Sequence, residues 1–154
     1  MPLLFFCLLF IMRPDRIIIG EIRDGAALDL LSALNTGHDG SLSTGHANSP
    51  EDMLSRLETM TLMSDVELPL EAVRRQISSA LEIVVHLGRL RDKSRKVLQI
   101  VEILGMKDGV IETKTLYEFV EEGEDEEGNV LGSLQPTGYQ LQQTEKLKRA
   151  GISL

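Results

Sequence analysis

A short run of β-branched residues followed by an amphipathic segment does most to limit what this chain can fold into. Residues 16–20 read Arg-Ile-Ile-Ile-Gly, with no alternation of apolar and polar side chains. Such a strand is usually buried on both faces, as in a parallel sheet. Residues 24–35 then place apolar side chains three and four positions apart, which predicts one buried face of a helix. A strand followed by a helix predicts an α/β arrangement.

A second strand and two further helices are expected in the first half of the chain. Residues 41–46 predict a brief strand beside the first one. Ser49 is a good N-cap residue and Pro50 suits the first helical turn, so a helix should begin there. After Pro69, apolar side chains repeat with helical spacing and predict another helix over residues 70–80.

In the second half of the chain, the spacing of apolar side chains changes from helical to strand-like. Residues 81–90 and 96–104 predict a β-hairpin around a polar turn, and residues 110–120 predict one or two further short strands. We expect a solvated acidic loop over residues 121–129 and a closing helix over residues 140–150. The elements together predict an α/β body with an antiparallel extension and a C-terminal helix.

Composition and charge exclude several classes of function. Hydrophobic residues make up 42% of the 154, which is enough for the core of one domain. The formal net charge is −8, but seven acids lie within residues 118–127. The rest of the chain is therefore close to neutral, and we expect no nucleic-acid partner because no broad basic face is present. The single cysteine, Cys7, excludes an internal disulfide and fits a reducing compartment.

The first twelve residues are apolar throughout and do not fit the rest of the pattern. A segment of twelve is too short to span a bilayer, which takes about 20 residues. It lacks the basic start and the small-residue cleavage site of a signal peptide. A buried strand or helix is one reading of it. We favour another, in which residues 1–12 are an anomalous leader left by a truncated or frameshifted gene.

Two polar side chains follow the two predicted parallel strands at the same end. Glu21 comes directly after the first strand, and His46 ends the second. Ligands of open α/β sheets bind at the carboxyl ends of the strands, so we expect these two side chains to lie close together there. A carboxylate in that place can orient or deprotonate a water molecule, and a neutral imidazole can contact a phosphate. Taken alone, Glu21 is better explained as a solvated strand-end carboxylate, because a strand that ends in Gly-Glu occurs in many proteins.

The surrounding residues resemble those of the secretion-superfamily ATPases, the ring motors of type II and type IV secretion and of type IV and Tad pili. Their Walker B strand, three apolar residues followed by Gly-Glu-x-Arg, is matched by residues 17–23. Their His box is matched by Thr36-Gly37-His38 and by His46-Ala47-Asn48-Ser49. The resemblance covers residues 12–154. Segments that look most like the Tad branch are 12–16, 35–41 and 128–152.

The resemblance implies a fold and a set of roles. The fold would be the C-terminal part of a RecA-like P-loop ATPase core, a parallel sheet flanked by helices. Residues 13–120 would form this partial ATPase domain, and residues 121–154 the acidic loop and tail. Glu21 would be the catalytic glutamate and His46 the residue that contacts the γ-phosphate region. The residues that would bind nucleotide or support this edge are Gly20, Arg23, Thr44 and His38.

Cofactors, partners and location also follow from the resemblance. The complete family uses ATP and Mg²⁺ and forms homo-hexamers with nucleotide between adjacent subunits. An inner-membrane platform protein would be the partner, and the protein would be cytoplasmic and peripheral to the inner membrane. An exposed sheet edge and an apolar leader also predict poor solubility.

The chain departs from the family pattern in three places. Gly45 stands where a bulkier apolar residue, usually Ile or Leu, is expected, and a strand glycine indicates a bulge or weaker packing. Residues 1–11 do not match the helix that should precede the Walker B strand. No G-x-x-x-x-G-K-[ST] loop occurs in the sequence. We therefore expect that this polypeptide alone neither binds ATP tightly nor hydrolyses it.

Other sites and another class of function are weighed against this interpretation. His38, Asp39 and His46 could ligate a metal, but a structural zinc site needs four close ligands, usually with cysteine, so we expect no metal. Ser41 and Ser43 could suggest a hydrolase triad, but the Gly-x-Ser-x-Gly elbow is missing. The main alternative is a non-enzymatic interaction module that docks to secretion or pilus machinery. Such a module would not need the paired acid and imidazole.

Overall fold

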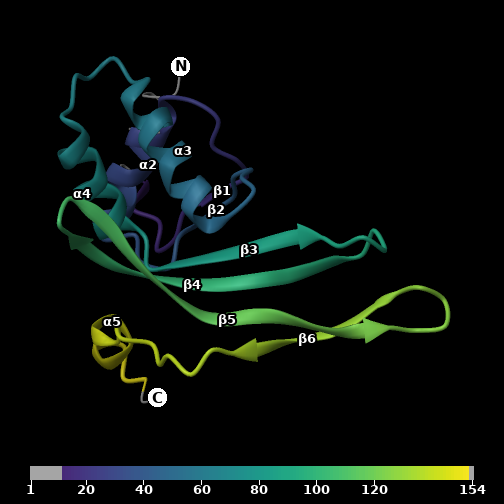
Figure 1. Cartoon of the computed structure of the whole chain (residues 1–154). Coiled ribbons are helices and arrows are strands. Elements are labelled where there is room, and N and C mark those ends of the chain that lie inside the picture. Colours follow the sequence, from purple (N-terminus) through teal and green to yellow (C-terminus); the bar gives the residue numbers. More distant parts are fainter. Residues whose placement is uncertain (1–11, 153–154) are drawn as a thin grey trace. The chain divides into compact units, whose positions relative to one another are not determined.

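The computed structural model describes residues 12–152, which form two compact units (Figure 1). The first unit holds the chain up to Leu81 together with the turn Met106–Ile111. The second holds Glu82–Gly105 and the chain from Glu112 onward. Parallel strands, helices, an antiparallel extension and a C-terminal helix are all present, so the predicted α/β class is confirmed. The interpretation of residues 1–11 lies outside the described residues.

Two short parallel strands organise the first unit. Strand β1 (Ile18–Ile19) pairs with β2 (Leu42–Ser43), and helix α2 (Ala26–Leu34) connects them. A helical crossover of this kind is what parallel strands require. The parallel pairing that the sequence predicts is therefore confirmed, although each strand is shorter than expected.

The prediction that the first strand is buried on both faces was wrong. Ile17 is buried, but Ile18 has 77% of its surface exposed and its partner Leu42 has 65%. Residues paired across two strands lie on the same face of a sheet. Within the first unit, this face of the strand pair is therefore largely exposed at Ile18 and Leu42.

Helices α3 (Pro50–Leu62) and α4 (Leu70–Ala80) pack with α2 to form the core of the first unit. The predicted start of α3 is confirmed, because the Ser49 hydroxyl accepts a hydrogen bond of 3.0 Å from the Asp52 backbone N–H and Pro50 occupies the first turn. Each helix turns one apolar stripe inward. The buried apolar residues of the three helices are Ala27, Leu30, Leu31, Ala33, Leu54, Leu57, Met60, Val73, Ile77 and Ala80.

The antiparallel sheet has the strand order β3-β4-β5-β6. Its strands are β3 (Ile83–Arg89), β4 (Arg95–Lys107), β5 (Val110–Glu124) and β6 (Val130–Pro136). The hairpin of β3 and β4 was predicted, and Ile83 pairs with Glu102 across it. No helix of the described part is long and apolar enough to cross a membrane.

The acidic segment corrects the sequence interpretation. Strand β5 is one continuous strand that runs to Glu124, so the predicted loop over residues 121–129 shrinks to the turn before β6. The acids of β5 from Glu118 onward are exposed, and the Arg91 guanidinium bridges Glu121 and Glu124. The start of β6 is held because Asp92 accepts a hydrogen bond of 2.8 Å from the Val130 N–H. Backbone pairing with β6 therefore decides the structure, and the charge pattern does not.

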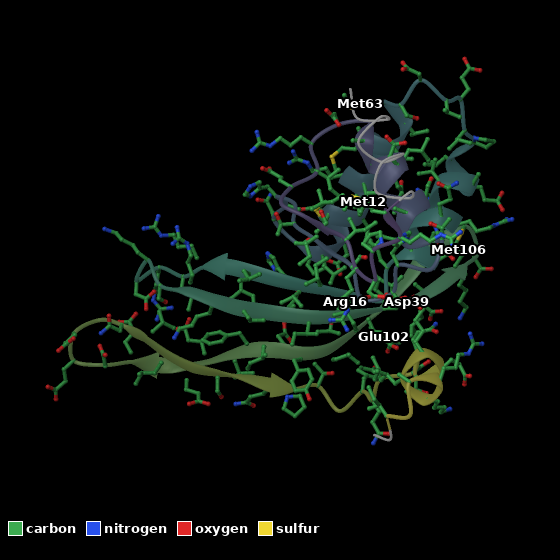
Figure 2. All side chains as sticks on the ribbon, turned by 180° about the vertical axis from the view of Figure 1, so that it is seen from behind. Met12, Arg16, Asp39, Met63, Glu102 and Met106 are labelled. Atoms are coloured by element: carbon green, nitrogen blue, oxygen red, sulfur yellow. The ribbon has the colours of Figure 1, made fainter. Side chains whose placement is uncertain are left out.

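The closing helix is also shorter than predicted. Helix α5 covers Glu145–Arg149, and not residues 140–150. The N–H groups of Gln142 and Gln143 donate instead to the carboxylate of Glu102, at 2.6 to 3.1 Å. Glu102 is fully buried and is labelled on β4 beside this segment in Figure 2. These bonds hold the segment before α5 in a non-helical form.

Candidate active site

The candidate site lies where β1 and β2 end. Past the last paired residues, the Ile22 N–H donates to the Thr44 carbonyl at 3.2 Å, and the Thr44 hydroxyl donates to the Gly20 carbonyl. These bonds continue the pairing of the two segments beyond the strands. Glu21 and His46 therefore leave the sheet at the same edge. Gly20 and Thr44 support this edge through their backbone and hydroxyl groups.

The Glu21 carboxylate lies between two cationic or titratable groups. His46 Nε2 is 3.3 Å from Glu21 Oε1, and the Arg23 guanidinium donates to Oε2. The Glu21 side chain is only 21% exposed, whereas those of Arg23 and His46 are 75% and 79% exposed. The predicted juxtaposition of Glu21 and His46 is confirmed. The carboxylate is partly sheltered, while its partners present N–H groups to solvent.

Electrostatics favour the ionised form of Glu21. The hydrogen bond from Arg23 lowers the pKa of Glu21, although partial burial opposes this effect. The positive charges of Arg23 and Arg56 and the electrostatic interaction with His46 lower the pKa of Glu21 further. The carboxylate is therefore ionised at neutral pH and can accept a hydrogen bond or a proton from a water molecule.

Arg56 belongs to the site and was missed by the sequence analysis. It lies on α3, and its Nη1 donates to the His46 carbonyl at 2.9 Å. Helical side chains lean toward the N-terminus of their helix, so an arginine in the second turn reaches back to the segment before the helix. That geometry is the one sequence feature that could have identified it, since Arg56 follows the Ser49 cap by seven residues.

His38 lies in a different local environment. It is buried, and its Nδ1 is 3.1 Å from the Ala33 carbonyl near the end of α2. The His38 carbonyl accepts a bond of 2.6 Å from the Ser41 hydroxyl, which in turn accepts from the Ile17 N–H at 2.8 Å. His38 thus joins the turn after α2 to the start of β1. These contacts favour a structural role.

The glycine that departs from the family pattern has a physical explanation. A Cβ atom built on Gly45 would lie 2.5 Å from the terminal methyl carbon of Met53. Met53 on α3 therefore fills the space that a larger side chain at residue 45 would need. The flexible thioether suits such an irregular gap.

The exposed partners of Glu21 fit an anionic oxygen better than a metal ion. Arg23 and His46 offer N–H donors at the rim, and Arg56 adds a further positive charge nearby. Within residues 12–152, no group of three or more His, Cys, Asp or Glu side chains is arranged to hold a metal. These residues could contact the terminal phosphate of a nucleotide. The backbone loop that would hold its other phosphates is not in the sequence.

Comparison with known proteins shows similarity over most of the chain. The family described as type II/IV secretion system protein matches residues 9–149. The conjugal transfer protein TrbB of Rhizobium radiobacter is 41% identical over 103 residues, which are 67% of this chain and 30% of that protein. The type IV secretion system protein VirB11 of Brucella suis is 38% identical over 78 residues, which are 49% of this chain and 22% of that protein.

A solved structure is similar as well. The crystal structure of the VirB11 ATPase from the Brucella suis type IV secretion system, in complex with sulphate, aligns with a TM-score of 0.59 and 31% identity. The alignment covers 62% of this chain and 30% of that one. The α/β fold is therefore similar to that of the VirB11 ATPase. The chain spans less than a third of the length of the relatives it matches.

Proposed function

Because the chain belongs to the type II/IV secretion system protein family, we propose that it supplies the hydrolytic edge of a motor ATPase that drives protein secretion or pilus assembly. The observation that carries this proposal is the Glu21 carboxylate held between Arg23 and His46 at the ends of two parallel strands. Ligands of α/β sheets bind at that edge. Residues 17–23 would be the Walker B strand, and residues 36–49 the His box.

Each residue at this edge would have a different chemical role. Glu21, ionised through its bond to Arg23, would orient the attacking water and take its proton. His46 and Arg23 would donate to the oxygens on which negative charge develops. Bound ATP with Mg²⁺ would supply the phosphoryl group and neutralise part of its charge. Gly20 and Thr44 would hold the two strand ends in register.

The finer properties of the motor belong to the same proposal. We propose a homo-hexamer in the cytoplasm that contacts an inner-membrane platform protein, with a sequence most like the Tad branch. The chain alone would not bind ATP tightly, because no phosphate-binding loop occurs in its 154 residues. Calorimetric titration of the chain with Mg·ATP tests this point. Micromolar affinity that is lost on Glu21→Gln or His46→Ala would contradict it.

The central proposal is tested in a chimera. The 103 matching residues of the Rhizobium radiobacter TrbB protein are replaced by those of this chain, and ATP hydrolysis is measured. We expect turnover, and Glu21→Gln should reduce it by about a hundredfold or more, as for a lost general base. Arg75→Gln, which changes an exposed helix pair, should leave turnover unchanged. A folded chimera without turnover, or with turnover that survives Glu21→Gln, would refute the proposal.

A second candidate function is a non-enzymatic interaction module. The observation that favours it is the open face of the parallel pair, on which the apolar side chains of Ile18 and Leu42 are exposed. Polar replacements such as Ile18→Ser with Leu42→Ser would then abolish association with motor subunits, while Glu21→Gln would not affect it. Pull-down experiments with the two variants separate this candidate from the first.

A further inference from the structure

Hydrogen bonds are the main contacts that can hold the segment carrying His46, because residues 44–46 are exposed. The His46 side chain is 79% exposed, and residues 44–47 have no regular secondary structure. An exposed imidazole on an irregular segment samples many orientations unless its backbone is held. The described hydrogen bonds hold the segment at two places: the strand end, through Thr44, and the His46 carbonyl, through Arg56.

Arg56 is well suited to hold that carbonyl because its own backbone is fixed. Its neighbours Leu54 and Leu57 are buried in the helical core. Two residues further along α3, Glu58 accepts bonds of 2.8 and 3.2 Å from Arg74 of α4. The Arg56 guanidinium thus extends from a helix whose position is set on both sides of it.

Arg56 also acts on the acid of the pair. Its positive charge lowers the pKa of Glu21, after the larger effects of the hydrogen bond and charge of Arg23 and of the interaction with His46. Of these three residues, Arg56 alone lies on a helix. The Arg56 side chain therefore contacts the backbone of His46 and stabilises the ionised carboxylate of Glu21.

We propose that Arg56 is a positioning residue, which ties the His46 carbonyl to helix α3 so that the imidazole stays within reach of Glu21. The importance of Arg56 for turnover rests on the proposed function. The contact between Arg56 and the His46 carbonyl involves only residues of the first unit. Coupling the segment to α3 also means that a displacement of this helix would move His46 relative to Glu21.

The geometric part is tested by NMR in the unchanged chain and in variants. In the unchanged chain, we expect a scalar coupling across the hydrogen bond between the Arg56 guanidinium and the His46 carbonyl. A nuclear Overhauser contact between the His46 ring and the Glu21 side chain should also be present. The absence of the coupling would overturn the proposal, and this outcome does not depend on whether any variant folds.

Three variants separate positioning from general loss of charge. In Arg56→Gln, the contact between His46 and Glu21 should disappear, and the Ile22 amide, which donates to Thr44, should exchange about tenfold faster, as for one lost hydrogen bond. Arg56→Lys keeps a donor and a charge and should restore most of both signals. Arg75→Gln removes an equal charge from α4 and should change neither. A contact that persists in folded Arg56→Gln would refute the inference.

Turnover in the TrbB chimera supplies a separate measurement. Arg56→Gln should lower kcat about tenfold or more and change KM less than twofold, because positioning acts in the transition state. Glu21→Gln in the same chimera tests the proposed function by itself. If the chimera were inactive while the NMR signals behaved as expected, the proposed function would fail and the positioning role would stand.

Discussion

Glu21 at the rim of the parallel pair and Glu102 in the antiparallel sheet are both strand-associated glutamates, yet their surroundings differ in kind. Glu21 is partly exposed and is held by the side chains of Arg23 and His46. Glu102 is fully buried and is held by backbone N–H groups of Gln142 and Gln143. Backbone donors order a distant segment, whereas exposed side-chain donors remain free to rearrange around a ligand. This difference in partners favours a structural role for Glu102 and agrees with the chemical role that we propose for Glu21.

The largest expected effect is on the structural carboxylate. Glu102→Ala should lower the free energy of unfolding by about 3 kcal/mol, because it removes the hydrogen bonds that the fully buried Glu102 accepts from Gln142 and Gln143. Glu102→Gln, which keeps one acceptor oxygen, should cost less, and the exposed control Glu118→Ala should cost little. Chemical denaturation measures all three. If Glu21→Ala destabilised the protein as much as Glu102→Ala, the comparison would fail.

A smaller effect on stability is expected at Gly45, which lies just before His46. Gly45→Leu should destabilise the protein by about 1–2 kcal/mol, because the new side chain competes with Met53 for the same space. Shortening the competitor in Gly45→Leu with Met53→Ala should recover most of that loss. Thermal unfolding of the two variants and of Met53→Ala alone makes a double-mutant cycle. Additive effects in that cycle would show that the two residues do not compete.

The pH dependence of the rim follows from the lowered pKa of Glu21. A carboxyl group whose pKa lies below 4.5 in the folded state adds stability above the unfolded value, and this stability is lost as the pH falls through the folded value. Arg23→Gln removes the main cause and should raise the pKa of Glu21 toward its ordinary value. NMR titration of the Glu21 side chain measures this directly. An unchanged pKa would show that Arg23 does not hold the carboxylate in solution.

The smallest effect is expected at the exposed end of the antiparallel sheet. Arg91→Gln should raise the pKa of Glu121, because the hydrogen bond from Arg91 is the main cause that lowers it. The change in stability should be slight and should vanish in high salt, since exposed ion pairs are screened. Titration and denaturation at two salt concentrations provide the measurement. A large effect that resists salt would place Arg91 with Glu102 as a structural group.

Sequence reasoning succeeded where one local segment carries the whole physical cause. The alternation-free run before Gly20 indicated a parallel strand, and Ser49-Pro50 indicated the start of α3. The position of Glu21 and His46 at one edge followed because both end parallel strands. Sequence reasoning missed the exposure of Ile18, since the residue pattern of a strand does not reveal which layers cover that strand. It also missed β6 and the end of β5, because solvent-facing acids in a strand look like a loop.

What the sequence by itself determined is therefore most of the elements of the first unit, the cap that begins α3 and the pair of residues that end the two parallel strands. These depend on spacing and on side-chain chemistry within a few positions of the chain. Only the tertiary structure decided that Arg56 holds His46, that Met53 fills the space beside Gly45 and that Glu102 binds the segment before α5. The physical reason is that these contacts join residues 8 to 41 positions apart, and such residues meet only when whole elements pack.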